Sequence, residues 1–228
     1  MKPYLCVFAV AAAASTALAG TVTTFDDSLD EGVVIGSGIG NTNFVVNTNA
    51  VMGIQTGIKA LERFIGDLPN SGNTYFAQPG ESPTSGAAGA PADPGTTTWN
   101  YFYSVDLGSS GLTFGDVAVL VSIDFDPVVG NSNFFTFDLA PLLGAGDTLV
   151  QDSQNIGFGF WQTLGDPNIF AINPFAPGEY TMSVEVLRLS DGALLSGVDM
   201  AVQVVPTPVA ASMGLVGLGV IGAHRRRR

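Results

Sequence analysis

Carboxylates are the side chains through which this chain could most readily do chemistry, because it contains 20 Asp and Glu residues. Asp124 and Asp126 lie two positions apart on a predicted strand, so both would point to one face. Four more acids fall between Asp26 and Glu31. Either group could bind calcium, which prefers several hard oxygen ligands, yet neither has the spacing of an EF-hand loop. We predict a solvated acidic surface with no resident cofactor and no metal site, and keep calcium binding by Asp124 and Asp126 as the alternative.

Paired carboxylates could also hydrolyse glycosides, with one acting as the acid and the other as base or nucleophile. The sequence singles out no such pair among its acids. Imidazole and thiol chemistry is excluded from residues 20–205, because the single histidine is His224 and the single cysteine is Cys6. The same positions exclude disulfides and Cys/His metal sites from this part of the chain.

Aromatic side chains offer another kind of chemistry, since sugar rings stack on exposed Trp and Tyr faces. Trp99, Tyr101 and Tyr103 alternate along one predicted strand and share a face. Trp161 lies in a second aromatic stretch. An outward face would form a carbohydrate platform, whereas an inward face would belong to the core. The alternation continues into the aliphatic Val105, which favours the core.

The charge of the chain excludes nucleic-acid binding. Residues 20–205 contain all 20 acids but only three of the eight basic residues, a net charge of −17, and the whole chain carries −12. A protein that binds nucleic acid needs a basic face to neutralise phosphates. Repulsion between like charges also limits self-association.

The N-terminal residues have the pattern of a secretory signal peptide. Lys2 supplies a positive start, and an apolar run follows over residues 5–14. Ala17 and Ala19 place small residues at positions −3 and −1 of a cut before Gly20. We therefore predict removal of residues 1–19 and export of the remainder.

The C-terminal residues form a second terminal signal. An uncharged apolar stretch covers residues 209–223. It is preceded by Val205, Pro206, Thr207 and Pro208 and followed, after one residue, by Arg225, Arg226, Arg227 and Arg228. As a helix the stretch would span about 22 Å, against about 30 Å for the hydrocarbon core of a bilayer. We predict a short transmembrane helix at 209–223 with its arginine cluster on the cytoplasmic side.

A signal peptide, an acidic Gly-rich body and a tail of Pro-x-Pro, apolar helix and Arg cluster together resemble the PEP-CTERM exported proteins of Gram-negative bacteria. The resemblance covers residues 205–228 and the overall layout, with Thr207 where the family name implies Glu. It implies that the tail is a sorting signal recognised by exosortase, a membrane protease or transpeptidase. It also implies association with extracellular polysaccharide and biofilm.

Alternating apolar residues predict β-strands over most of the body. In the N-terminal half, the expected strands are 21–25, 33–35, 44–47 and 53–64, and the last would also suit a helix. In the C-terminal half, they are 99–107, 117–125, 133–139, 155–161, 179–189 and 194–205. Ser190–Ala193 is a hairpin turn by its Asp-Gly signal. Tyr180 follows Pro177 and Gly178, a pattern that fits either a plain core residue or the corner tyrosine of immunoglobulin-like sandwiches.

These elements predict an all-β fold, an antiparallel β-sandwich of jelly-roll or immunoglobulin-like type with a short transmembrane helix at its C-terminus. Residues 1–19 would be the signal peptide, 20–204 the sandwich and 205–228 the sorting tail. Residues 79–97 consist mostly of Gly, Pro, Ala, Ser and Thr, so we expect a disordered loop there. This loop is either an insertion in one domain, which the length of the body favours, or a boundary between two.

The combined prediction is a non-enzymatic exported protein, anchored in the membrane through its C-terminus and then displayed at the cell surface or in the extracellular matrix. Its partners would be an exosortase-type sorting enzyme, the membrane and exopolysaccharide. A carbohydrate-binding module of the β-sandwich type and a glycosidase-like enzyme that uses paired carboxylates are the alternatives.

Overall fold

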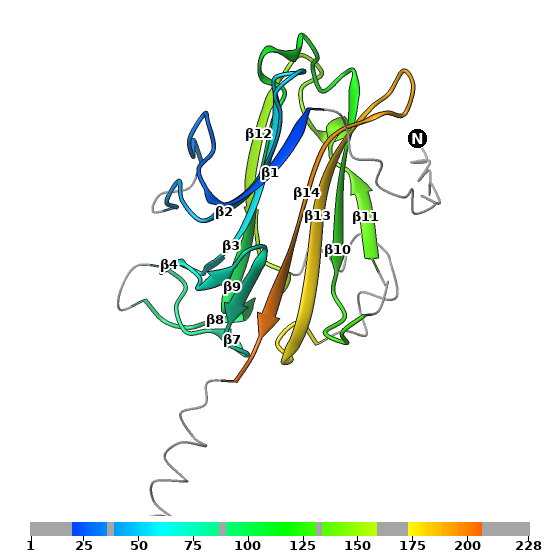
Figure 1. Cartoon of the computed structure of the whole chain (residues 1–228). Coiled ribbons are helices and arrows are strands. Elements are labelled where there is room, and N and C mark those ends of the chain that lie inside the picture. Colours follow the sequence, from blue (N-terminus) through cyan, green and yellow to red (C-terminus); the bar gives the residue numbers. More distant parts are fainter. Residues whose placement is uncertain (1–19, 36–38, 87–89, 131–133, 159–172, 207–228) are drawn as a thin grey trace, which may run out of the picture.

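The computed structural model describes residues 20–35, 39–86, 90–130, 134–158 and 173–206, which form an all-β body of two facing sheets (Figure 1). Two 3-10 helical turns, η1 (Gly108–Ser110) and η2 (Ala140–Leu142), lie in loops of this described part. No helix in these ranges is long and apolar enough to cross a membrane. The predicted signal peptide at 1–19 and the predicted helix at 209–223 lie outside the described residues.

The first sheet has the strand order β1-β2-β3-β9-β12, and β4 pairs with the end of β3. All of its pairings are antiparallel. Its strands are β1 (Thr21–Asp27), β2 (Phe44–Asn49), β3 (Ile54–Glu62), β4 (Gly66–Asp67), β9 (Trp99–Asp106) and β12 (Leu149–Gln154).

The second sheet has the order β11-β10-β13-β14-β6-β5. Its strands are β5 (Asn70–Ser71), β6 (Thr74–Ala77), β10 (Val117–Asp124), β11 (Phe134–Asp138), β13 (Gly178–Arg188) and β14 (Leu194–Val204). The prediction of an antiparallel sandwich is wrong at one pairing, because β6 runs parallel to β14. After β4 the chain leaves the first sheet. β6 then pairs with the edge of β14 and runs in the same direction, so the second sheet contains both parallel and antiparallel pairings.

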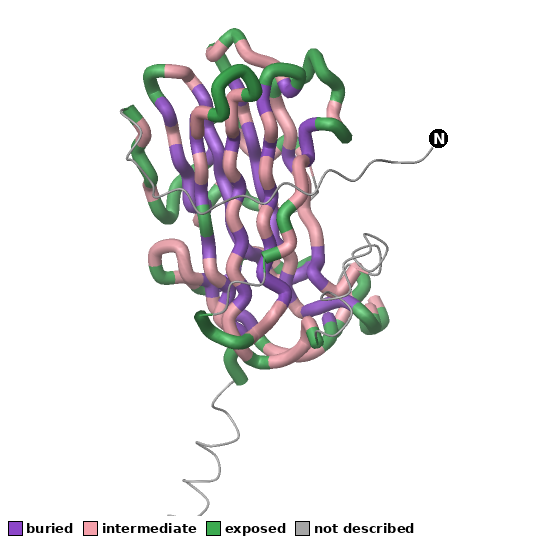
Figure 2. Tube along the Cα trace, turned by 90° about the vertical axis from the view of Figure 1, so that its right-hand side faces the viewer, coloured by how far each residue is buried: buried purple, intermediate pink, exposed green. Residues whose placement is uncertain are grey.

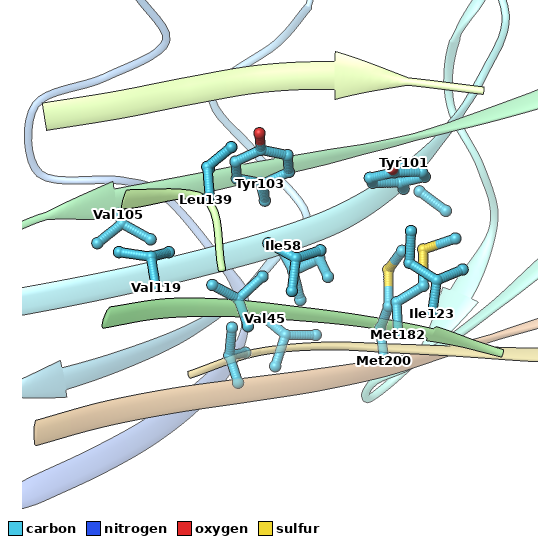
Figure 3. Packing of buried hydrophobic residues seen from close by; sticks show 14 of the residues in the cluster. Val45, Ile58, Tyr101, Tyr103, Val105, Val119, Ile123, Leu139, Met182 and Met200 are labelled. Carbon is cyan, nitrogen blue, oxygen red and sulfur yellow. The ribbon is translucent and has the colours of Figure 1, made fainter. Parts of the chain in front are cut away.

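The core lies between the two sheets and is built from the inward residues of both (Figure 3). Val45, Ile58 and Tyr103 of the first sheet meet Val119 of β10 and Met200 of β14. Figure 2 shows buried residues along the strands and exposed residues in the loops at both ends. Burial of apolar area at about 25 cal/mol per Å² holds such layers together.

The outer face of the first sheet is also covered. Residues 28–35 and 39–43, here called the strap, lie across it, and Leu29 packs there with Phe44 and Phe102 in a second, smaller apolar cluster. Gly57 in the middle of β3 makes this packing feasible, because a Cβ at that position would overlap with the Leu29 side chain. Gln151 of β12 fastens the strap by accepting a hydrogen bond from its backbone and donating one to it.

Most predicted strands are confirmed, namely those at 21–25, 44–47, 99–107, 117–125, 133–139, 179–189 and 194–205, within one or two residues at their ends. The helix alternative for 53–64 is wrong, since this segment is β3. The strand expected at 33–35 is part of the strap. The strand expected at 155–161 is wrong over its described residues, 155–158, which contain a turn and no strand. Strand β12 ends just before them, at Gln154.

The segment 79–97 contains more structure than expected. Its described residues form a two-stranded ribbon of β7 (Glu81–Ser82) and β8 (Asp93–Thr97), so a wholly disordered loop is wrong. Two polar contacts hold this ribbon in place. Arg63 forms an ion pair with Asp93, and the Thr97 N–H donates to the side chain of Asn155. Composition misses such contacts, since the anchoring residues lie elsewhere in the sequence. Strands on both sides of the segment contribute to the single core between the sheets.

Candidate functional site

The aromatic residues proposed as a carbohydrate platform lie inside the core. Trp99, Tyr101 and Tyr103 on β9 are each at most 3% exposed and belong to the core cluster between the sheets. Figure 3 shows Tyr101 and Tyr103 among the core side chains. The rings of Trp99 and Tyr180 lie 5.7 Å apart, and burial raises the pKa of the Tyr101 and Tyr103 hydroxyls. These three rings therefore offer no surface to a sugar. Trp161 lies outside the described residues.

Tyr180 ties a loop to the second sheet. Its hydroxyl donates to the Ala176 carbonyl at 2.9 Å and approaches the Asn173 carbonyl at 3.3 Å, while its ring is fully buried. A tyrosine that bonds the backbone a few residues upstream is the corner arrangement of immunoglobulin-like sandwiches. Tyr180 is therefore a core residue, and its hydroxyl also makes the backbone bond that the corner interpretation predicts.

Asp124 and Asp126 do not share a strand face, because β10 ends at Asp124. The Asp124 carboxylate is buried and accepts the Asp126 N–H at 2.9 Å, while Asp126 accepts the Val128 N–H at 3.0 Å. Both carboxylates therefore bond to their own turn. Among the described residues, no three Asp, Glu, His or Cys side chains gather as metal ligands.

Removing the Asp124 charge should stabilise the protein at neutral pH. Burial raises the pKa of Asp124 above 3.8, with repulsion from Asp126 and Glu179 adding to it. Between 3.8 and the raised pKa the folded state binds more protons, so the free energy of unfolding falls as pH rises through this window. Asp124→Asn keeps an oxygen for the Asp126 N–H. We expect higher stability than wild type at about pH 7 and equal stability near pH 2.5, measured by urea denaturation.

The matched control for this prediction is Asp126→Asn, which alters a less buried carboxylate of the same turn. We expect it to change the free energy of unfolding by less than about 0.5 kcal/mol at either pH. Equal or lower stability of Asp124→Asn at neutral pH would contradict the assigned burial penalty.

Arg63 organises the end of the first sheet. Its Nη2 donates to Asp93 Oδ2 at 2.6 Å, and about a tenth of its side chain is exposed. The guanidinium carbon lies 4.5 Å from the ring centre of Phe64 and 5.1 Å from that of Phe158. Two aromatic rings and one carboxylate therefore hold this cation, an arrangement suited to fixing the β3–β4 hairpin to the β7–β8 ribbon.

Asn155 completes the polar cluster at this end and is fully buried. Its Nδ2 donates to the carbonyls of Thr97 and Trp99 and to the side chain of Asn100, at 2.8–3.0 Å. Its Oδ1 accepts the backbone N–H groups of Thr97 and Gly157. One side chain thus joins the ends of β8 and β12 and the start of β9.

Lys59 is a buried cation on the outer face of the first sheet. Its Nζ donates to Asp67 Oδ1 at 2.6 Å and to the carbonyls of Gly40 and Thr42 at 2.7 and 3.1 Å. The Phe44 ring centre lies 4.6 Å away. Burial lowers the pKa of Lys59, and the Asp67 carboxylate opposes this shift. Three acceptors match the three protons of an ammonium group, so Lys59 pins the strap to the sheet.

The first and last described residues, Gly20 and Pro206, lie at opposite ends of the sheets. Gly20 is exposed and its carbonyl accepts the Ala50 N–H at 3.2 Å, beside the β2–β3 turn. Val205 and Pro206 are exposed at the other end, where the Val205 N–H donates to Ala77 O at 3.0 Å. The remaining predicted signal residues lie outside the described residues: Ala17, Ala19, Thr207, Pro208, Arg225, Arg226, Arg227 and Arg228.

Comparison with known proteins adds no relative. No protein-family model matches this chain, and a search of curated proteins returns no match.

Two polar centres, Lys59 and Asn155, are not predictable from the sequence. In the sequence, Lys59 is one of three basic residues over 20–205, and Asn155 is the first residue of a predicted strand. Their partners are chiefly backbone carbonyls and amides of distant segments. Sequence patterns carry no signal for such partners. Both centres are structural, since each cross-links loops to the first sheet.

Proposed function

We propose that this chain is a non-enzymatic exported protein, sorted through its C-terminal tail by an exosortase-type system and displayed at the cell surface or in an exopolysaccharide matrix. The observation that carries the proposal is the sequence from Val205 to Arg228, in which a Pro-x-Pro frame, an apolar stretch and an arginine cluster follow in order. The signal-peptide pattern before Gly20 supports the same route.

The geometry of the body is compatible with such sorting. β14 is the last strand, and the chain leaves it at Val205 and Pro206, which are both exposed. A sorting enzyme in the membrane could therefore reach the Pro-x-Pro frame without unfolding either sheet. In this proposal the apolar stretch at 209–223 anchors the protein before processing, with the arginines on the cytoplasmic side.

The matrix association is part of the proposal. The net charge of −17 over residues 20–205 keeps copies of the body apart unless cations or a polymer bridge them. We further propose an immunoglobulin-like rather than jelly-roll type for the sandwich, on the strength of the Tyr180 corner bond to Ala176. No observation in the described residues favours a carbohydrate-binding module or a glycosidase.

The intact mass of the protein from its native surface tests the proposal. We expect a product that starts at Gly20 and ends near Pro206–Pro208 in cells with their exosortase, and a longer product in cells without it. Replacing Arg225–Arg228 with glutamine should block the processing, whereas Arg188→Gln, which changes a partly exposed arginine of the body, should leave it intact. A product that retains Arg228 in both strains would contradict sorting and leave a simple membrane anchor.

A further inference from the structure

The chain leaves β14 at the bottom of Figure 1, and the end of the body around this exit is here called the tail-proximal end. Five apolar residues near this exit are exposed. They are Phe64 at 52%, Ile65 at 63%, Val128 at 62%, Val129 at 70% and Val205 at 44% exposure. Phe64 and Ile65 form the tip of the β3–β4 hairpin, and the two valines follow β10. Three segments far apart in the sequence thus present apolar side chains at one end.

Hydrogen bonds place the hairpin tip beside the chain exit. The Val205 N–H donates to Ala77 O at 3.0 Å, and the next carbonyl, that of Gln78, accepts the Thr98 hydroxyl at 2.5 Å. Thr98 O in turn accepts the Arg63 N–H at 2.9 Å. Phe64 is the next residue along the chain. The tip therefore lies a few backbone contacts from Val205.

The loop after β10 lies on the other side of the exit. Val204 pairs with Gly178 at the end of the β13–β14 ladder. The neighbouring Glu179 N–H donates to Pro127 O at 3.1 Å, and Val128 follows directly. Val128 and Val129 therefore share this end with Val205.

The few residues between Val205 and the predicted membrane stretch limit how far the tail-proximal end can lie from the membrane. The predicted membrane stretch begins at Val209, four residues after Val205. Four residues span at most about 14 Å when fully extended. If the stretch enters a bilayer at Val209, the tail-proximal end must lie within about that distance of the point of entry, at the depth of the headgroups.

At the hairpin tip, the exposed Phe64 occupies a backbone conformation that favours glycine. Phe64 has φ 62°, a left-handed conformation that costs a bulky residue about 1–2 kcal/mol. The Arg63 guanidinium packs under its ring and supports it. An exposed aromatic side chain at a strained backbone position points to a surface role, and aromatic rings are enriched at membrane interfaces.

We propose that the tail-proximal end rests on the lipid surface of the anchoring membrane, with Phe64, Ile65, Val128 and Val129 in contact with zwitterionic headgroups. This inference rests on the proposed anchoring by residues 209–223. Zwitterionic lipid is the partner because Asp126 and Glu179 at this end would repel an anionic surface.

Single cysteines test the contact, because residues 20–228 contain no cysteine of their own. The chain of residues 20–228, with its tail unprocessed, would be reconstituted in phosphatidylcholine–phosphatidylethanolamine vesicles and labelled with a polarity-sensitive fluorophore at Ile65→Cys or Val129→Cys. Val51→Cys and Leu189→Cys are the matched controls, since these residues are 78% and 60% exposed at the opposite end. We expect brominated lipids to quench the first pair at least threefold more than the second.

The outcomes separate the two proposals. A chain that fails to float with the vesicles would contradict the anchoring and this inference together. A chain that floats but shows equal quenching at all four positions would contradict this inference alone. Stronger quenching at Ile65→Cys in vesicles that contain phosphatidylglycerol would overturn the assignment to zwitterionic lipid.

A second variant distinguishes a lipid contact from a structural role of Phe64. Phe64→Gly relieves the left-handed strain, so the melting temperature should stay equal or rise. The quenching at Ile65→Cys should fall by at least half in the same background. A lower melting temperature with unchanged quenching would assign Phe64 to the stability of the hairpin and overturn its role at the membrane.

Discussion

Replacing Lys59 with methionine should lower the free energy of unfolding by about 3 kcal/mol. The methionine fills a similar volume but donates no hydrogen bond. The carbonyls of Gly40 and Thr42 would lose their donor, and a buried polar group without a partner costs about 1–3 kcal/mol. Asp67 would lose its counter-ion, although its side chain is a quarter exposed and water can replace part of the interaction. Urea denaturation at pH 7 measures the loss.

The matched control is Arg188→Met, which removes an exposed ion pair with Asp191 on the β13–β14 hairpin. Exposed pairs contribute about 0–1 kcal/mol, so this variant should remain close to wild type. Hydrogen exchange would locate the Lys59 effect, because the strap (residues 28–35 and 39–43) should lose protection before the core strands do. Equal losses in the two methionine variants would contradict the role assigned to Lys59.

The strands that alternate between a buried and a solvated face were predictable. β10, β13 and β14 show this pattern in the sequence, and the structure buries every second residue along most of their length. β3 was ambiguous between strand and helix because both of its faces are covered, so its buried residues follow no period of two. The strap covers the outer face of β3. Within β3, the small Gly57 is the residue that indicates this cover.

The sequence pattern does not predict β12, because a tertiary contact with the strap again replaces the usual alternation. Its sequence after Val150 is polar, and Gln151 faces the strap rather than solvent, where its amide bonds to Gly32 and Val34. The sequence pattern therefore predicts a strand in the following segment, where residues 156–161 are mostly apolar. Local patterns identify a strand through its apolar side chains, and here a polar side chain supplies the tertiary contact.

The aromatic residues show what alternation can decide about a candidate site. Trp99, Tyr101 and Tyr103 continue into Val105 on one face, and this continuity favoured the core, where the structure places them. The two acids at 124 and 126 were placed on one strand face, but β10 ends between them. The terminal signals, by contrast, are linear patterns and depend on no tertiary contact.

The polar cluster at the tail-proximal end could not be predicted, because it depends on one side chain that joins three distant segments. We expect Asn155→Ala to lower the free energy of unfolding by about 3–4 kcal/mol. The substitution leaves the carbonyls of Thr97 and Trp99 and the N–H of Gly157 without their partner inside the protein. Each such loss costs about 1–3 kcal/mol, and partial entry of water offsets part of the sum. Thermal and urea unfolding measure it.

Asn73→Ala is the matched control for Asn155→Ala, because it removes a single exposed bond to Asp199 and should cost less than about 0.5 kcal/mol. Asn155→Asp separates hydrogen bonding from packing, since it keeps the shape and the acceptor but loses both donors and buries a charge. If hydrogen bonding is what holds β8, β9 and β12 together, the aspartate variant must be at least as unstable as the alanine variant at pH 7. An aspartate variant close to wild type would instead show that the side chain acts through its volume alone.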